Sequence, residues 1–98
     1  MSEPSAEKQS ADIFSELTGE IVVLDALSPY VFIGVLVRTD LHFLILEDAD
    51  VHDFRDTQTT RDLYVLDARE HGVRSNRRRV FVRRDEIVAV SLFREVVK

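Results

Sequence analysis

Hydrophobic residues alternate with polar ones, or gather with β-branched residues, in five short stretches of the chain. Such stretches are typical of β-strands, in which successive side chains point to opposite faces. A glycine in the middle of the second stretch, Gly34, indicates the bend or bulge that a small barrel needs in order to close. The expected strands cover residues 21–26, 30–38, 41–49, 79–84 and 87–93.

The N-terminal part of the chain is polar at first and then becomes amphipathic. Residues 1–10 lack the apolar core of a signal peptide and are expected to form a disordered tail. Ser10 is placed to cap a short helix over residues 12–17, which carries its apolar side chains on one face. Residues 11–98 are then expected to form one domain, as the chain length of 98 residues predicts.

A second helix is expected between the third and fourth strands. Residues 61–70 have a partly apolar face, Thr59 or Thr60 precedes them as an N-terminal cap, and Gly72 ends them. Residues 50–58 are polar and acidic, which predicts an irregular connection leading into this helix.

The composition narrows the class of protein. Hydrophobic residues make up 45% of the chain, which is enough for a small core. The chain has no cysteine, which excludes a disulfide-stapled scaffold and thiolate metal sites. No apolar run reaches the ~18 residues of a membrane span. We therefore expect a soluble, cytoplasmic protein.

Charge is distributed unevenly along the chain. The net charge of −5 argues against an indiscriminate nucleic-acid binder. Residues 40–70 nevertheless hold nine acidic side chains and three arginines, whereas residues 74–84 hold six arginines and no acid. The arginines at 77–79 fit a phosphate-binding rim, and they equally fit ion pairs with the acidic stretch of the same or a neighbouring subunit.

Patterns that would indicate catalysis or a metal site are weak. Residues 47–53 are dense in carboxylates and contain His52, but they lack the glycine and the terminal glutamate of an EF-hand loop. There is no cysteine nucleophile and no G-x-S-x-G elbow, and three glycines in the whole chain exclude a glycine-rich nucleotide loop. We expect a non-enzymatic protein without catalytic residues, metal or cofactor.

Two blocks of the sequence resemble the two halves of the Sm/LSm signature. The first half reads G-x-x-V-x-V, then G-x-L, then D-x-H-M-N-L-V-L-x-D-A, and residues 19–24, 34–36 and 40–49 are similar to it. The second half reads I-R-G-D-N-I-V-x-I, and residues 82–90 are similar to it. The resemblance implies a mainly β fold, a bent five-stranded antiparallel barrel of the small SH3 type. An N-terminal helix and a helix inserted at about residues 50–76 would be added to it.

The resemblance also implies a function. Sm-like proteins assemble into homo-oligomeric rings, here expected to have six or seven subunits, and they bind single-stranded RNA. Two loops make the RNA pocket, one between strands two and three and one between strands four and five. Stacking on a base in such a pocket is worth about 1–3 kcal/mol. Carried onto this chain, the RNA contacts would come from Asp40, His42, Phe43, Arg83 and Arg84.

This chain departs from the signature in both loops. It is one residue shorter between Asp40 and Asp48, so Phe43 stands where the signature has its asparagine. The hydrogen-bonding partner of the base edge is then missing unless His42 replaces it. In the second loop Arg84 replaces the glycine.

Structural roles compete with RNA contacts at the same positions. Asp40 is suited to stabilise a turn by accepting bonds from its own backbone, and Arg83 is suited to pair with Asp40 or Asp85. A second hypothesis therefore stands beside the first. The chain would be an Sm-fold scaffold that has lost RNA binding and recruits a protein partner through the inserted helix, whose acidic residues repel RNA.

Overall fold

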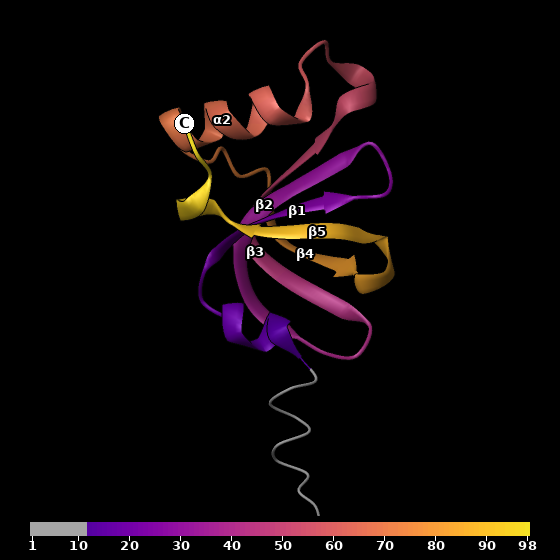
Figure 1. Cartoon of the computed structure of the whole chain (residues 1–98). Helices are drawn as coiled ribbons and strands as arrows, with labels where there is room; N and C mark the ends of the chain where they lie inside the picture. The colour runs from indigo at the N-terminus through magenta and orange to yellow at the C-terminus, as the bar shows by residue number, and fades with distance from the viewer. Residues whose placement is uncertain (1–11) are drawn as a thin grey trace, which may run out of the picture.

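Five strands, one α-helix and four 3₁₀ helices make up the part of the chain that the computed structural model describes, residues 12–98 (Figure 1). The strands form one antiparallel sheet in the order β4-β3-β2-β1-β5, so that β4 and β5 are its outermost strands. The elements in chain order are η1 (Ile13–Leu17), β1 (Ile21–Ala26), β2 (Tyr30–Thr39), β3 (Phe43–Asp53), η2 (Phe54–Asp56), α2 (Arg61–His71), β4 (Arg77–Arg83), η3 (Arg84–Glu86), β5 (Ile87–Leu92) and η4 (Phe93–Glu95).

The sheet bends where Gly34 of β2 lies against β3, as the glycine in the second expected strand predicted. The pairing register shifts between Ile33 and Val35, on either side of Gly34. A Cβ atom on Gly34 would lie 3.0 Å from both Cα and Cβ of Ala49, so only glycine lets the two strands approach this closely. Asp48, next to this contact on β3, has φ of 49°, the left-handed geometry of a bulge.

Strand β3 is longer than expected, and the prediction of an irregular acidic connection over residues 50–58 was wrong for its first part. Pairing of β2 with β3 extends over residues 50–53, from Ile33↔Asp50 to Tyr30↔Asp53. Asp50 is only 3% exposed, although carboxylates seldom lie buried without partners. Its partners come from elsewhere in the fold, because the Tyr64 hydroxyl donates to one of its oxygens and the Asn76 amide approaches the other at 3.4 Å.

Helix α2 confirms the prediction for residues 61–70 and continues to His71. The Thr60 hydroxyl accepts a hydrogen bond from the backbone N–H of Leu63 at 3.2 Å, which caps the N-terminus. Gly72 ends the helix with φ of 97°, and its N–H donates to the carbonyl of Ala68 at 2.7 Å.

The inserted helix packs on its own domain. Arg61 donates to the backbone carbonyls of Tyr30 at 2.6 Å and Ser28 at 2.7 Å, which fastens the start of α2 to the β1–β2 turn. Burial and the hydrogen bond to Asp50 raise the pKa of Tyr64 above its usual value, so its hydroxyl remains a donor across the neutral pH range.

Two apolar clusters lie on opposite faces of the sheet. One fills the concave side, is closed by Phe14 and Leu17 around η1, and contains Val22, Leu24, Leu36, Leu44, Leu46, Ala49 and Val82. The other lies under α2 and η4 and contains Val23, Val31, Ile33, Val65 and Ala68. Figure 1 shows α2 and η1 at opposite ends of the sheet. No helix in residues 12–98 is long and apolar enough to cross a membrane.

Several boundaries differ from the sequence-based predictions, and β3 begins at Phe43 where the expected strand began at residue 41. The N-terminal helix is a 3₁₀ helix, Ile13–Leu17, capped by the Asp12 side chain, while the predicted cap Ser10 lies outside the described residues. Strand β4 begins at Arg77, two residues before the expected start, because Arg77 pairs with Ala49 of β3. The fourth expected strand, residues 79–84, ends one residue early, because Arg84 begins the 3₁₀ helix η3, Arg84–Glu86, that leads into β5.

Candidate nucleic-acid interface

The loop between β2 and β3 is organised by one carboxylate. Asp40 Oδ1 accepts hydrogen bonds from the backbone N–H groups of His42 at 2.9 Å and Phe43 at 2.8 Å. The backbone N–H of Asp40 in turn donates to the carbonyl of Phe43 at 3.0 Å. These bonds favour the charged carboxylate, and they hold the pKa of Asp40 below its usual value. The turn-stabilising role considered for Asp40 is therefore present, and the loop keeps a defined shape.

The loop between β4 and β5 lies directly beside it. Phe43 pairs with Arg83 across β3 and β4, and the backbone N–H of Arg84 donates to the carbonyl of His42 at 2.8 Å. A cavity of about 310 Å³ opens between the two loops, lined by Leu41, His42, Phe43, Arg83, Arg84 and Asp85. Four of the five predicted contact residues thus line one cavity, and Asp40 shapes the loop that carries two of them.

Arg83 lies at the exposed side of this cavity. Its guanidinium donates to Asp85 at 2.7 Å, and both side chains are about two-thirds exposed (64% and 65%). Of the two ion pairs considered for Arg83, the structure contains the one with Asp85. An exposed pair of this kind contributes at most about 1 kcal/mol, so the guanidinium can exchange Asp85 for a ligand at low cost.

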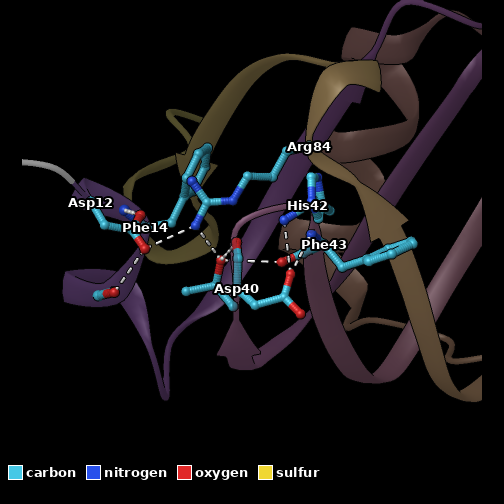
Figure 2. Close-up of polar contacts among 8 residues, drawn as sticks. Asp12, Phe14, Asp40, His42, Phe43 and Arg84 are labelled. Carbon is cyan, nitrogen blue, oxygen red and sulfur yellow. Dashed lines mark hydrogen bonds and ion pairs between the residues drawn. The ribbon is translucent and has the colours of Figure 1, made fainter.

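Arg84 points the other way. Figure 2 shows its side chain running toward Asp12 and Phe14, whereas the Phe43 ring extends to the opposite side of the loop. Its Nη2 donates to Asp12 at 2.8 Å and to Thr39 at 2.6 Å, and the guanidinium lies over the Phe14 ring at 4.9 Å from its centroid. The Arg84 side chain is 23% exposed. These contacts fasten η1 to the end of β2.

The ion pair with Arg84 lowers the pKa of Asp12. Burial by itself would raise the pKa of Asp12, but hydrogen bonds from Arg84 and Ser15 outweigh burial, and the pKa falls below its usual value.

Sequence reasoning missed Asp12, Thr39 and Phe14 as partners of Arg84 because nothing local joins residues 72 positions apart. It also missed Leu41, which is 79% exposed at the mouth of the cavity. An apolar residue inside a turn was the available signal.

The arginines at 77–79 divide between the two interpretations. Arg79 forms an ion pair with Glu47 at 2.7 Å, so part of the acidic stretch does pair with this segment within one subunit. Among the side chains that the structure describes, Arg77 and Arg78 form no ion pair with a carboxylate. In the same part of the chain, no group of three or more histidine and carboxylate side chains is arranged to hold a metal ion.

Comparison with known proteins places the fold. No protein-family model matches the sequence, and no curated protein matches it. An Sm protein of Pyrococcus abyssii, solved in complex with a uridine heptamer, is similar in structure, with 17% identity and a TM-score of 0.56. The match covers 93% of this chain and 99% of that one. The chain therefore has an Sm-like fold.

Chains from two structures of the NatC complex are also similar. One complex is bound to Gag peptide and CoA, and its chain matches with 14% identity and a TM-score of 0.51 over 81% of this chain and 89% of that one. The other is bound to CoA, and its chain matches with 16% identity and a TM-score of 0.53 over 87% and 92%. Similar folds thus occur in a protein solved with a uridine heptamer and in the NatC complex solved with CoA.

Proposed function

We propose that this chain is a non-enzymatic, Sm-like RNA-binding protein that captures single-stranded RNA in the cavity between its β2–β3 and β4–β5 loops. The observation that carries the proposal is the meeting of His42 and Phe43 with Arg83 around one cavity, on loops that Asp40 and the Arg84 backbone hold in place. Aromatic rings and a guanidinium plane are the groups that stack on unpaired bases. The Sm protein that shares the fold was solved with a uridine heptamer.

The cavity is suited to stack an unpaired base but has few groups that could distinguish one base from another. Phe43 takes the place of the amide that would bond a base edge, and His42 is the remaining side chain that can do so at that loop. Stacking tolerates any base, because every base has a π-face. We therefore propose RNA binding with weak sequence preference, in the cytoplasm.

Ring assembly is part of the same proposal. Strands β4 and β5 each have one unpaired edge, and an unpaired edge favours addition of a strand from another chain. On the β5 edge, Val88 is an apolar side chain that is 64% exposed. Pairing of the β4 edge with the β5 edge of the next subunit would satisfy the unpaired backbone groups of both strands and, repeated, would close a ring of six or seven subunits.

Native mass spectrometry combined with one substitution tests this proposal. We expect protein purified without nuclease to appear as a closed oligomer, and Arg83→Ala to weaken oligouridine binding about tenfold, which corresponds to the loss of one stacking contact. Fluorescence anisotropy measures the affinity. Lys98→Ala, which removes a cation at the exposed C-terminus, serves as the matched control.

A folded Arg83→Ala protein with unchanged affinity would remove Arg83 from the interface. A monomer without affinity for oligouridine would remove the proposed function itself.

A protein-interaction scaffold is the second candidate, and the outer face of α2 favours it. Leu63 is 59% exposed there, beside a cavity of about 470 Å³ that Leu66, Asp67 and Glu70 also line. An exposed leucine among carboxylates fits a partner that is both apolar and basic. The likeness to chains of the NatC complex shows that the fold occurs within a multi-protein assembly.

A surface substitution tests the scaffold better than removal of the helix, because Val65 and Ala68 of α2 belong to the core. Leu63→Arg is expected to abolish retention of any partner that binds α2, as measured by pull-down and mass spectrometry. Leu27→Arg, at a site 71% exposed in the β1–β2 turn, is the control and should retain the partner. Equal retention by both variants would rule out this face of the helix.

A further inference from the structure

A row of arginines and aromatic rings crosses the outer face of β2, β3 and β4. The strand register places Arg38 and Phe81 on either side of Ile45, and Arg83 beside Phe43. Residues two apart on a strand share a face, so Phe43 and Ile45 point to the same side, opposite the buried Leu44 and Leu46. We call the surface formed by Arg38, Phe43, Phe81 and Arg83 the outer platform.

The apolar part of the outer platform is open. Phe81 is 56% exposed and Phe43 is 36% exposed, and their rings meet edge to face with centroids 6.4 Å apart. Beneath them Ile45 is only 4% exposed, so the two rings form a firm layer over the sheet. A cavity of about 270 Å³ continues from this layer, lined by Val37, Arg38, Ile45, Glu47, Arg79 and Phe81.

Three arginines surround these rings, one without an ion pair and two in exposed ion pairs that a ligand could replace. Arg38 is exposed and forms no ion pair with a carboxylate among the described residues. Arg79 is held by Glu47 and Arg83 by Asp85, in pairs whose side chains are 37–65% exposed. Pairs this exposed add little stability, so a phosphate can replace either carboxylate. The acidic helix α2 lies on the same face of the sheet, but it packs over Val31 and Ile33, which pair with His52 and Asp50 toward the other end of β3.

We propose that the outer platform is a second stacking site for single-stranded RNA, continuous with the loop cavity. The inference rests on the proposed function and extends its site. A strand that places one base in the loop cavity would pass over Phe43, stack a following base on Phe81 and bring its phosphates to Arg38. Stacking rings flanked by arginines are the combination that binds single strands regardless of sequence.

Two oligouridines separate this site from the loop cavity. The first is a dinucleotide, which is long enough to occupy only the loop cavity. The second has about twelve nucleotides, within the span that single-strand-binding folds cover. We expect Phe81→Ala to weaken the longer oligouridine about tenfold, the effect of one lost base-stacking contact, and to leave the dinucleotide unchanged. Leu27→Ala, which removes an exposed apolar side chain elsewhere, 71% exposed against 56% for Phe81, is the control. Fluorescence anisotropy and native mass spectrometry are measured on each variant.

Each other outcome overturns the inference in a recognisable way. Full affinity of Phe81→Ala for the longer oligouridine, with Arg83→Ala still impaired, would remove the outer platform and leave the proposed function intact. A smaller oligomer for Phe81→Ala would mean that a second copy of the chain covers Phe81. No binding of either oligouridine to the unaltered protein would remove both the platform and the proposed function.

Discussion

Replacing Gly34 with valine is expected to lower the free energy of unfolding by about 3 kcal/mol, at the upper end of the cost of overpacking a core. Any Cβ at this position lies 3.0 Å from Cα and Cβ of Ala49 and 3.1 Å from the carbonyl oxygen of Glu47. Two of these three atoms belong to the backbone of β3, so relief requires the strands to separate where the sheet bends. Urea denaturation followed by circular dichroism measures the effect.

The same strand offers a control for the Gly34 experiment. Arg38→Val also places a β-branched side chain on β2, but at an exposed position, where the change should stay within about 0.5 kcal/mol. An unfolding midpoint for Gly34→Val equal to that of the control would mean that β2 and β3 do not approach as closely as the structure has them. Because a domain of this size is stable by only about 5–15 kcal/mol, the expected loss is a large share of the total.

The adjacent arginines 83 and 84 are expected to separate stability from binding. Arg84→Ala should lower the free energy of unfolding by about 2 kcal/mol, the magnitude of a charge-assisted hydrogen bond, because it leaves Asp12 and Thr39 without their shared donor. Arg83→Ala should cost less than about 1 kcal/mol, since its pair with Asp85 is exposed. Oligouridine binding should show the reverse order, with the larger loss for Arg83→Ala.

Acid dependence gives the Arg84 experiment a second readout. The pKa of Asp12 is lower in the folded chain than its ordinary value of 3.8, so the pair stabilises the fold above pH 3.8 and loses this effect as the pH falls below it. The difference in stability between the unaltered protein and Arg84→Ala should therefore narrow in acid. Equal stability of the two proteins at pH 7 would contradict the assigned role of Arg84 in holding η1.

Local chemistry explains which parts of the fold were predictable. Helix α2 begins after Thr60 and ends at Gly72 because a hydroxyl cap and a left-handed glycine act within four residues of the chain. Asp40 shapes its loop through bonds two and three residues away, so its role too could be anticipated from sequence. Strand β3 was predicted too short because an aspartate such as Asp50 is typical of a loop. The Tyr64 and Asn76 side chains that allow Asp50 to be buried come from distant segments of the chain.

The sequence by itself determined the five strands, the capped helix and the pair of loops in which Asp40, His42 and Arg83 stand, because strand periodicity, capping and turn chemistry act over a few residues. Tertiary structure alone decided where the neighbouring side chains go. It directs Arg84 to Asp12 at the far end of the chain, brings Phe81 beside Phe43, and lays α2 over Val31 and Ile33, away from the platform that Phe43 and Phe81 form. These choices depend on which strands pair and how sharply the sheet bends, which local pattern does not specify.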